Sequence, residues 1–321
     1  MPWSTSEIPS LDGTRAVVTG GNGGLGLQTA LELARKGAAV TIAVRNPDKG
    51  AEAVDRIRRE VPDARLQLAP LDLADLSSVR AFAAAEEAAG LPLDLLVNNA
   101  GVMATPPRQT ADGFELQLGT NHLGHFALTG LLLDRLKAAP TPRVVTVSSL
   151  AHRVGSIDFD DLNWQRSYGP WKAYGRAKLA NLLFARELQA RADAAGLPLR
   201  SVAAHPGYSS TGLQTTGPGM SGGVLGRLNA LVGSVGNVVV GTSDRYGAGA
   251  TLYAATHPEV AGGGFVGPTR VSQTRGAIGP VPSSAAGRDM AVARRLFDVS
   301  EELTGVSFGL PAASGAAPAA A

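Results

Sequence analysis

The stretch "RAVVTGGNGGLG", residues 15–26, decides the fold class. An apolar run ends at Thr19, a glycine-rich segment follows, and helical periodicity begins at Leu25. Glycines allow the backbone to approach a pyrophosphate closely, and the helix N-terminus behind them presents free N–H groups. A bare glycine turn is the alternative, but the position between strand and helix predicts a dinucleotide site. Its predicted residues are Gly20, Asn22, Gly24, Leu25 and Gly26.

Downstream of this loop, apolar runs of strand length alternate with segments of helical periodicity. The predicted strands lie within residues 15–20, 38–44, 65–72, 93–100, 143–149, 199–207 and 262–268. The predicted helices are Leu25–Lys36, Asp48–Glu60, Ser77–Ala89, Asp112–Ala138, Trp171–Ala194 and Ser243–His257. Near-continuous apolar strands alternating with helices indicate a parallel sheet covered on both faces. We therefore expect one doubly wound α/β domain over residues 12–310, with a seven-stranded, mostly parallel sheet.

Composition excludes several classes of function. The 321 residues carry 29 basic and 27 acidic side chains, a net charge of +2 that predicts no nucleic-acid partner. Cysteine is absent, which excludes disulfides and thiol chemistry and suits a reducing compartment. The start "MPWSTSEIPSLDG" is too polar for a signal peptide or anchor, and no apolar run approaches the roughly 20 residues of a spanning helix. We expect a cytoplasmic protein without a membrane partner.

Three segments interrupt the alternation. Residues 151–170 form a polar and aromatic insertion, in which Trp164, Tyr168 and the following Trp171 could line a pocket or anchor the insertion. Residues 208–242, rich in Gly, Ser, Thr, Leu and Val, are expected to form a substrate lid. The Ala-rich tail, residues 311–321, is expected to be disordered.

The end of the second predicted strand, "TIAVRN", bears on cofactor choice. An acidic residue there would bind the ribose 2′-hydroxyl of NAD, whereas this chain has Arg45 followed by Asn46. Arginine pairs well with a 2′-phosphate, so the sequence favours NADP over NAD; a solvated arginine is the alternative. Asp72, after the third strand, is placed to contact the adenine ring, or else to cap the next helix.

The helix predicted over Trp171–Ala194 carries Tyr174 and Lys178 on one face, because residues four apart are neighbours on a helix. A phenol has an ordinary pKa of about 10, too high for a good acid or base at neutral pH. A nearby ammonium favours the phenolate, so we expect Lys178 to lower the pKa of Tyr174. The alternative is an incidental tyrosine beside a surface lysine.

Four motifs in order resemble the short-chain dehydrogenase/reductase family: "TGGNGGLG", "NNAG" at 98–101, "VTVSS" at 145–149 and "YGRAK" at 174–178. The likeness covers about residues 12–310. "NHLGHF", "SSLAHR" and "KLANLLFARELQ" are similar to the retinol dehydrogenase-like branch and its bacterial relatives. Light-dependent protochlorophyllide reductases are a more distant likeness. The resemblance implies a Rossmann-type fold.

The resemblance also implies roles for four residues. Tyr174 would be the general acid in reduction and the general base in oxidation, and Lys178 would also hold the nicotinamide ribose. Ser149 would stabilise the substrate oxygen, with Ser148 as the alternative. Asn121 would kink its helix and anchor a proton-relay water, unless it is an ordinary helix amide.

By the same resemblance, further cofactor contacts come from the loops after the third, fourth and sixth strands. They are Leu73, Asn99, Ala100, Gly101, Pro206, Gly207 and Thr211, beside Tyr174 and Lys178 themselves. His122 and His125 have no acidic partner at ligand spacing, so no metal is expected. His152 and Arg153 could touch a substrate or could be exposed loop residues.

Together these features predict an oxidoreductase that transfers a hydride between NADP(H) and an apolar carbonyl or alcohol substrate. Two alternatives remain: a non-catalytic NADP-sensing protein, and a C=C reductase resembling protochlorophyllide reductase, whose pocket cysteine this chain lacks. The apolar helices Asp112–Ala138 and Trp171–Ala194 could form a homodimer interface or could be buried within the monomer.

Overall fold

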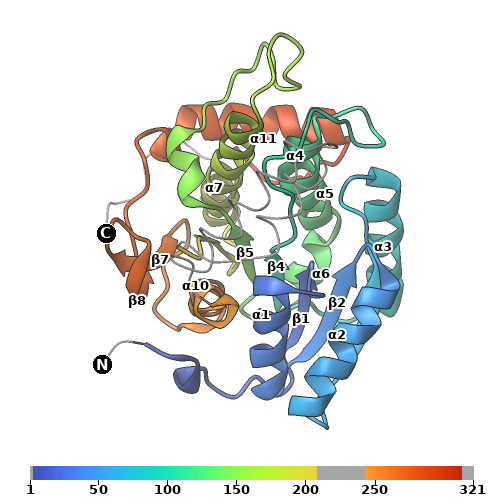
Figure 1. Ribbon diagram of the computed structural model, residues 1–321. Helices are drawn as coiled ribbons and strands as arrows, with labels where there is room; N and C mark the ends of the chain where they lie inside the picture. Colours follow the sequence, from blue (N-terminus) through green and yellow to red (C-terminus); the bar gives the residue numbers. More distant parts are fainter. Residues whose placement is uncertain (1–2, 208–242, 313–321) are drawn as a thin grey trace, which may run out of the picture.

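The computed structural model describes residues 3–207 and 243–312 and contains one eight-stranded sheet in the order β3-β2-β1-β4-β5-β6-β7-β8 (Figure 1). The strands β1 to β7 pair in parallel, and β8 pairs with β7 in the antiparallel direction. The doubly wound α/β architecture expected from the sequence is confirmed, with one strand more than the expected seven.

The strands are β1 Arg15–Thr19, β2 Ala39–Val44, β3 Leu66–Pro70, β4 Leu95–Asn98, β5 Arg143–Val147, β6 Arg200–Ala204, β7 Phe265–Arg270 and β8 Arg275–Pro280. The α-helices are α1 Gly24–Arg35, α2 Pro47–Glu60, α3 Leu76–Ala89, α4 Leu116–Leu118, α5 Gly124–Leu131, α6 Leu133–Lys137, α7 Pro170–Ala194, α10 Asp244–Thr256 and α11 Met290–Thr304. Short 3-10 turns are η1 Thr5–Glu7, η3 Leu150–Val154 and η4 Ala286–Arg288, and a π-helical turn is η2 Gly119–Leu123.

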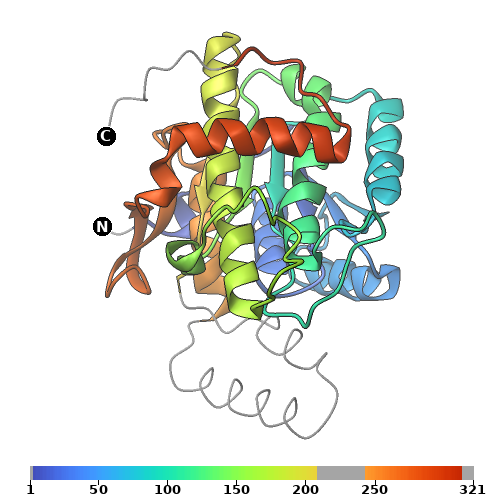
Figure 2. The ribbon, with the colours of Figure 1, turned by 90° about the horizontal axis from the view of Figure 1, so that it is seen from above.

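Helices cover both faces of the sheet (Figure 2). Consecutive strand residues point to opposite faces, so each strand contributes side chains to two cores. Ala16 and Val18 belong to a core with apolar residues of α1, α2 and α10. Val17, between them, packs in a second core with residues of α3, α5, α7 and α11. Strands buried on both faces account for their near-continuous apolar sequences.

The helix predicted over Asp112–Ala138 begins later than predicted, at Leu116, and is divided into four helical segments. Gly113, with φ +82°, lies in a turn, and the Glu115 carboxylate caps the start of α4 by accepting from the amides of Gln117 and Leu118. The chain then passes through η2, α5 and α6. Local bonds of turn residues and caps therefore delay the start of the helix relative to the helical periodicity.

The unexpected strand β8 forms a hairpin with β7. Its sequence, "RGAIGP", holds two glycines and a proline, which lower β propensity. The linking turn places Val271, Ser272 and Gln273 at positive φ, between +51° and +69°. Pairing with the edge of β7 therefore creates a strand that the local sequence does not predict. The expected lid, residues 208–242, and residues 313–321 of the expected tail lie outside the described residues.

Candidate active site

The predicted site residues that the structure describes lie at the carboxyl edge of the sheet, where the strand order reverses between β1 and β4. In open α/β sheets ligands bind at such a reversal, because the two neighbouring loops diverge there. The glycine loop follows β1, "NNAG" follows β4, and the Ser148–Ser149 and Pro206–Gly207 segments follow β5 and β6.

The glycine loop packs directly on the loop after β4. Gly20 has φ +67°, and a β carbon on it would lie 3.0 Å from Ala100. A β carbon on Gly26 would overlap the Gly20 carbonyl and the Asn99 side-chain amide. The Thr19 hydroxyl accepts hydrogen bonds from the amides of Asn99 (2.9 Å) and Ala100 (3.0 Å). Only glycine, which lacks a β carbon, fits where the glycine loop and the loop after β4 approach each other this closely.

The N-terminus of α1 fits a pyrophosphate. Its N-cap, Gly23, makes no side-chain capping bond, so the first amides of the helix keep their donors for a ligand. Gly24 begins the helix at φ +52°, Asn22 is half-buried beside it, and the Leu25 side chain is buried.

At the end of β2, Arg45 is exposed, and within the described residues it makes no hydrogen bond or ion pair. The neighbouring Asn46 caps α2, because its side-chain oxygen accepts from the Lys49 amide at 3.0 Å. The end of β2 lies next to the glycine loop, and the Gly20 amide donates a hydrogen bond to the Ala43 carbonyl at 2.8 Å. Arg45 is therefore free to meet a ligand at the loop.

Asp72 does not cap α3. Its Oδ1 accepts from the Ala74 amide at 2.9 Å, and the cap is Asp75, which accepts from Ser77 and Ser78. The alternative interpretation of Asp72 as a plain helix cap is thus wrong. The side chain of Leu73 belongs to the core beneath.

Tyr174 is 6% exposed and packs with Met103, Ala104 and Ala151. Burial raises the pKa of Tyr174 to about 12, and a hydrogen bond with Ser149 acts in the opposite direction. The expected lowering by Lys178 is not found. Removing the phenol from water disfavours the phenolate more strongly than the neighbouring groups favour it.

Lys178 is buried beneath the tyrosine. Its Nζ lies 5.7 Å from the centre of the Tyr174 ring and donates to the Val147 carbonyl at 2.9 Å. Burial lowers the pKa of Lys178 to about 8. The side chain of Asn181, one turn on, donates to the same carbonyl at 3.0 Å. Asn181 is a further polar residue of the site that no sequence motif indicated.

The two adjacent serines face different ways. Ser148 is 1% exposed and its hydroxyl donates to the Lys178 carbonyl at 2.7 Å, inside the protein. Ser149 is half-buried, interacts with Tyr174 in the direction that lowers the pKa of the phenol, and its Oγ accepts from the Ala151 amide at 3.2 Å. Of the two, only Ser149 reaches the phenol.

Asn121 lies in the π-helical turn η2 and is fully buried. Its amide side chain bonds Val102 twice, accepting from the backbone N–H at 2.7 Å and donating to the carbonyl at 2.9 Å. A β carbon on Gly101 would come within 2.8 Å of its Oδ1 and 3.8 Å of the Lys178 Nζ. Asn121, Gly101 and Lys178 thus meet beside the loop after β4.

Pro206 and Gly207 form a half-buried turn after β6, and Gly207 has φ +72°. A β carbon on Gly207 would lie 2.6 Å from the Thr274 carbonyl in the β7–β8 turn. This turn therefore needs glycine both for its backbone angle and for its packing. Thr211 lies outside the described residues.

The histidines of α5 and η2 are structural. The Nε2 of His122 lies 3.0 Å from Ser300 Oγ. The ring of His125 hydrogen-bonds through Nδ1 to the Asn121 carbonyl and through Nε2 to the Thr19 hydroxyl, each at 2.9 Å. Burial lowers the pKa of His122 to about 3 and of His125 to about 4, which keeps both neutral. In residues 3–207 and 243–312 no three His, Asp or Glu side chains are arranged to hold a metal ion.

The aromatic residues of the insertion divide into two groups. Trp164 lies under the Arg176 guanidinium at 4.0 Å, and the Tyr168 hydroxyl bonds the Thr105 carbonyl at 2.9 Å and the Gln117 amide at 2.8 Å. These contacts anchor the insertion to the body. Trp171 is 58% exposed, and its ring meets the Tyr174 ring edge-on at 6.2 Å. Of the three, Trp171 alone is left to line a pocket.

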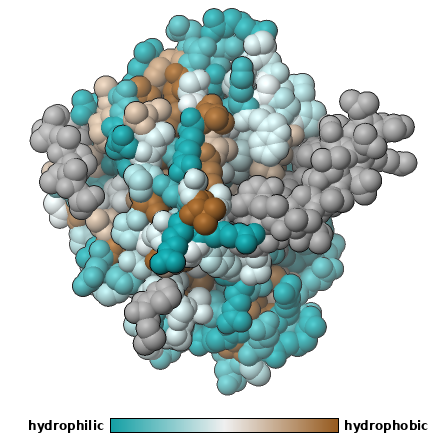
Figure 3. All heavy atoms as spheres, turned by 60° about the vertical axis from the view of Figure 1, so that its left-hand side comes forward, coloured by the Kyte–Doolittle hydropathy of each residue, from teal (hydrophilic) through white to brown (hydrophobic). Residues whose placement is uncertain are grey.

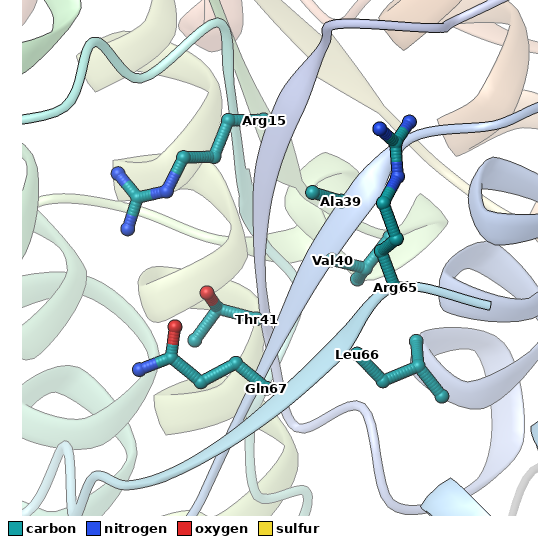
Figure 4. A pocket seen from close by; sticks show the side chains of 7 residues that line it. All are labelled: Arg15, Ala39, Val40, Thr41, Arg65, Leu66 and Gln67. Carbon is teal, nitrogen blue, oxygen red and sulfur yellow. The ribbon is translucent and has the colours of Figure 1, made fainter.

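One cavity, of about 250 Å³, opens at the amino ends of β1, β2 and β3 (Figure 4). The guanidinium groups of Arg15 and Arg65 diverge there, and each has an acidic neighbour, Glu86 and Asp12 respectively. This cavity lies at the opposite edge of the sheet from Tyr174 and holds no part of the candidate site.

The described surface on the β7–β8 side mixes hydrophilic side chains with small separate hydrophobic spots (Figure 3). The apolar face of α7 packs on the sheet and on α11 within the chain, so its composition requires no partner subunit. Among the described helices, none combines the length and the apolar character needed to cross a bilayer.

Comparison with known proteins agrees with this geometry. Residues 14–218 match the family described as short chain dehydrogenase. Polyprenol dehydrogenase of Mus musculus is 42% identical over 306 residues, which cover 94% of this chain and 87% of that protein. Retinol dehydrogenase 13 of Homo sapiens is 48% identical over 211 residues, 65% of this chain and 62% of that protein. The alignment to this second relative thus spans less than two thirds of its length.

A solved structure extends the likeness. The crystal structure of an uncharacterized protein from Mycobacterium Paratuberculosis is 45% identical, with a TM-score of 0.78, and covers 97% of this chain and all of that one. The glycine loop, the adjoining "NNAG" segment and these relatives lead to one assignment. The chain belongs to the short-chain dehydrogenase family, in its retinol dehydrogenase-like branch, and is an oxidoreductase of a family that binds NAD(P).

Proposed function

We propose that this protein is an NADP-preferring oxidoreductase that interconverts an apolar aldehyde or ketone and its alcohol, with residues 12–310 as one catalytic unit. The main support is the meeting of Tyr174, Ser149 and Lys178 at the carboxyl edge, beside the glycine loop. A nicotinamide bound there would supply or accept the hydride. The chain itself supplies the proton, the orientation and the polar contacts.

Tyr174 is the proton donor in the direction of reduction. Because burial raises the pKa of Tyr174 to about 12, the phenol keeps its proton at neutral pH. The alkoxide that develops on the substrate is a stronger base than a phenolate, so the proton moves from Oη to the substrate oxygen. In oxidation the same group takes the proton back.

Ser149 orients the substrate oxygen. Its Oγ already accepts from the Ala151 amide, so its own hydrogen is available for donation toward that oxygen or toward Tyr174. A fixed donor aimed at developing negative charge stabilises the transition state. Lys178 and Asn121 stand beside Gly101, which supports a role for Lys178 in holding the ribose and for Asn121 in fixing the loop.

Arg45 carries the preference for NADP. It is an exposed cation at the end of β2 without a partner in residues 3–207 and 243–312, and the neighbouring residues Val44 and Asn46 offer no carboxylate to a ribose 2′-hydroxyl. A guanidinium and a 2′-phosphate form charge-assisted hydrogen bonds.

The surroundings of the phenol support an apolar substrate class. Met103, Ala104 and Ala151 pack on Tyr174, and the exposed indole of Trp171 meets its ring. A carbonyl presented to Oη would therefore carry apolar substituents. The names of the two relatives, a polyprenol and a retinol dehydrogenase, point to the same lipophilic class.

A steady-state assay of NADPH oxidation tests the proposal with three aldehydes: decanal, glyceraldehyde and 2-decenal. We expect kcat/KM for decanal to exceed that for glyceraldehyde by about tenfold or more, because each buried CH₂ contributes about 0.8 kcal/mol. Tight NADPH binding without turnover of any aldehyde would identify a sensor instead. Reduction of 2-decenal at its C=C bond alone would identify a C=C reductase.

A further inference from the structure

His152 follows Ser149 by three residues, in the turn η3, and its side chain is 0% exposed. From the sequence, His152 could be a substrate contact or an exposed loop residue; in the structure it is buried, and its ring is hydrogen-bonded. Its Nδ1 lies 2.6 Å from the Ser149 carbonyl oxygen, and its Nε2 accepts from the Ser284 amide at 3.2 Å. Both ring nitrogens are therefore used, one of them on the backbone of Ser149.

These two partners fix the state of the ring. A carbonyl oxygen can only accept, so Nδ1 carries a hydrogen; a backbone N–H can only donate, so Nε2 carries a lone pair. The neutral Nδ1–H imidazole satisfies both bonds. An imidazolium would place a second N–H against the Ser284 amide and lose that bond.

The surroundings also disfavour the charged ring. The imidazole meets the Phe265 ring of β7 edge-on at 5.2 Å, and His205 packs on the same ring at 4.9 Å. Burial lowers the pKa of His152, and the positive charges of Arg153 and Arg186 act in the same direction. The bond to the Ser149 carbonyl opposes them.

The segment bound by Nε2 is itself held on α7. Ser284 Oγ accepts from the Gly287 amide at 3.2 Å, and Arg186 of α7 donates to the Gly287 carbonyl. A β carbon on Gly287 would lie 2.6 Å from Leu182, also of α7. His152 thus links the turn that carries Ser149 to the helix that carries Tyr174 and Lys178.

We propose that His152 is a positioning residue, which as a neutral imidazole holds the Ser149 turn against the 283–288 segment so that the serine hydroxyl faces Tyr174. The proposal rests on the role assigned to Ser149 under the proposed function. His152 does not contact the reacting atoms, so its effect passes through Ser149.

The matched variants His152→Asn and His152→Gln test it, because both are polar and each restores a different bond. An asparagine amide reaches the position of Nδ1 and can donate to the Ser149 carbonyl, whereas a glutamine amide reaches the position of Nε2. We expect His152→Gln to lower kcat about 10- to 100-fold, since a small misplacement of a catalytic group costs up to about 10²-fold. His152→Asn should recover most of kcat, and neither should change the Kd for NADPH by more than about twofold.

The pH profile and a double variant complete the test. Wild-type kcat should fall on the acid side where His152 takes up a proton, and His152→Asn should lack that fall. In a Ser149→Ala background, His152→Gln should cost no further turnover. Equal kcat in the Asn and Gln variants, or an undiminished cost without Ser149, would overturn the positioning role.

The variants distinguish a failure of the positioning role from a failure of the role of Ser149. If Ser149→Ala lowers kcat while His152→Gln does not, only the role of His152 is wrong. If Ser149→Ala leaves kcat unchanged, the role of Ser149 is wrong and the positioning role falls with it.

Discussion

The Nζ of Lys178 donates to the carbonyl oxygen of Val147, 2.9 Å away. Val147 is the last residue of β5, and the chain continues directly into Ser148 and Ser149. The side-chain amide of Asn181 donates to the same oxygen at 3.0 Å. In the opposite direction, the Ser148 hydroxyl donates to the Lys178 carbonyl at 2.7 Å. The helix with the tyrosine and the strand with the serine are thus joined by three side-chain bonds.

The buried position of Lys178 predicts an alkaline limit to cofactor binding. Because burial lowers the pKa of Lys178 to about 8, its charge is present below that pH and is lost as the pH rises through it. A hydrogen bond from a charged group contributes about 1.5–3 kcal/mol, so the Kd for NADPH should rise about tenfold or more between about pH 7 and about pH 10. Fluorescence titration of NADPH across this range measures the effect.

Lys178→Arg is the matched control, because a guanidinium stays charged throughout this range. The Lys178→Arg variant can bind NADPH more weakly than the wild type at neutral pH, but its affinity should not fall further as the pH rises. A wild-type Kd that stays constant to about pH 10 would contradict the placement of the ammonium at the cofactor.

Substituting each of the adjacent serines should separate chemistry from stability. Ser149→Ala should lower kcat by about 10²-fold or more, the usual cost of removing a donor to a developing oxyanion. Ser148→Ala should keep most of kcat but lose about 1 kcal/mol of unfolding free energy, because its buried bond to the Lys178 carbonyl is removed. Steady-state kinetics and urea unfolding of both variants measure this, and the reverse pattern would make Ser148 the catalytic serine.

Arg45→Ala should weaken the binding of NADPH but not that of NADH. Loss of a charge-assisted bond to the 2′-phosphate should raise the Kd for NADPH about 10- to 100-fold and change that for NADH less than about twofold. Arg58→Ala, an exposed arginine in the last turn of α2, is the control and should change neither. Equal losses for both cofactors at position 45 would remove Arg45 from the specificity site.

The sequence predicted most of the elements whose signal is local. The seven apolar strands and the helices bounded by caps, such as α2 after Asn46, were found within a few residues. The helix α11 was not predicted, although Asp289 caps its start and Gly305, at φ +61°, ends it. The strand β8 could not be predicted, since pairing with β7 creates it.

Within the site, the same distinction holds. The shared helix face of Tyr174 and Lys178 follows from their spacing, and so does the glycine turn. The bonds from Asn99 to Thr19, 80 residues away, and from His152 to Ser284, 132 residues away, leave no local pattern. The pKa of Tyr174 was predicted in the wrong direction, because burial of the phenol depends on Met103 and Ala104, which lie on another loop.

The most direct test of the central claim is the turnover of Tyr174→Phe, measured beside its affinity for NADPH. The variant removes one hydroxyl and keeps the ring that packs against Met103 and Ala104. We predict a Kd for NADPH within about twofold of wild type and a kcat for decanal lower by at least ~10²-fold, as expected for the loss of a general acid. Turnover that survives this substitution would contradict the assignment of Tyr174 as the proton donor.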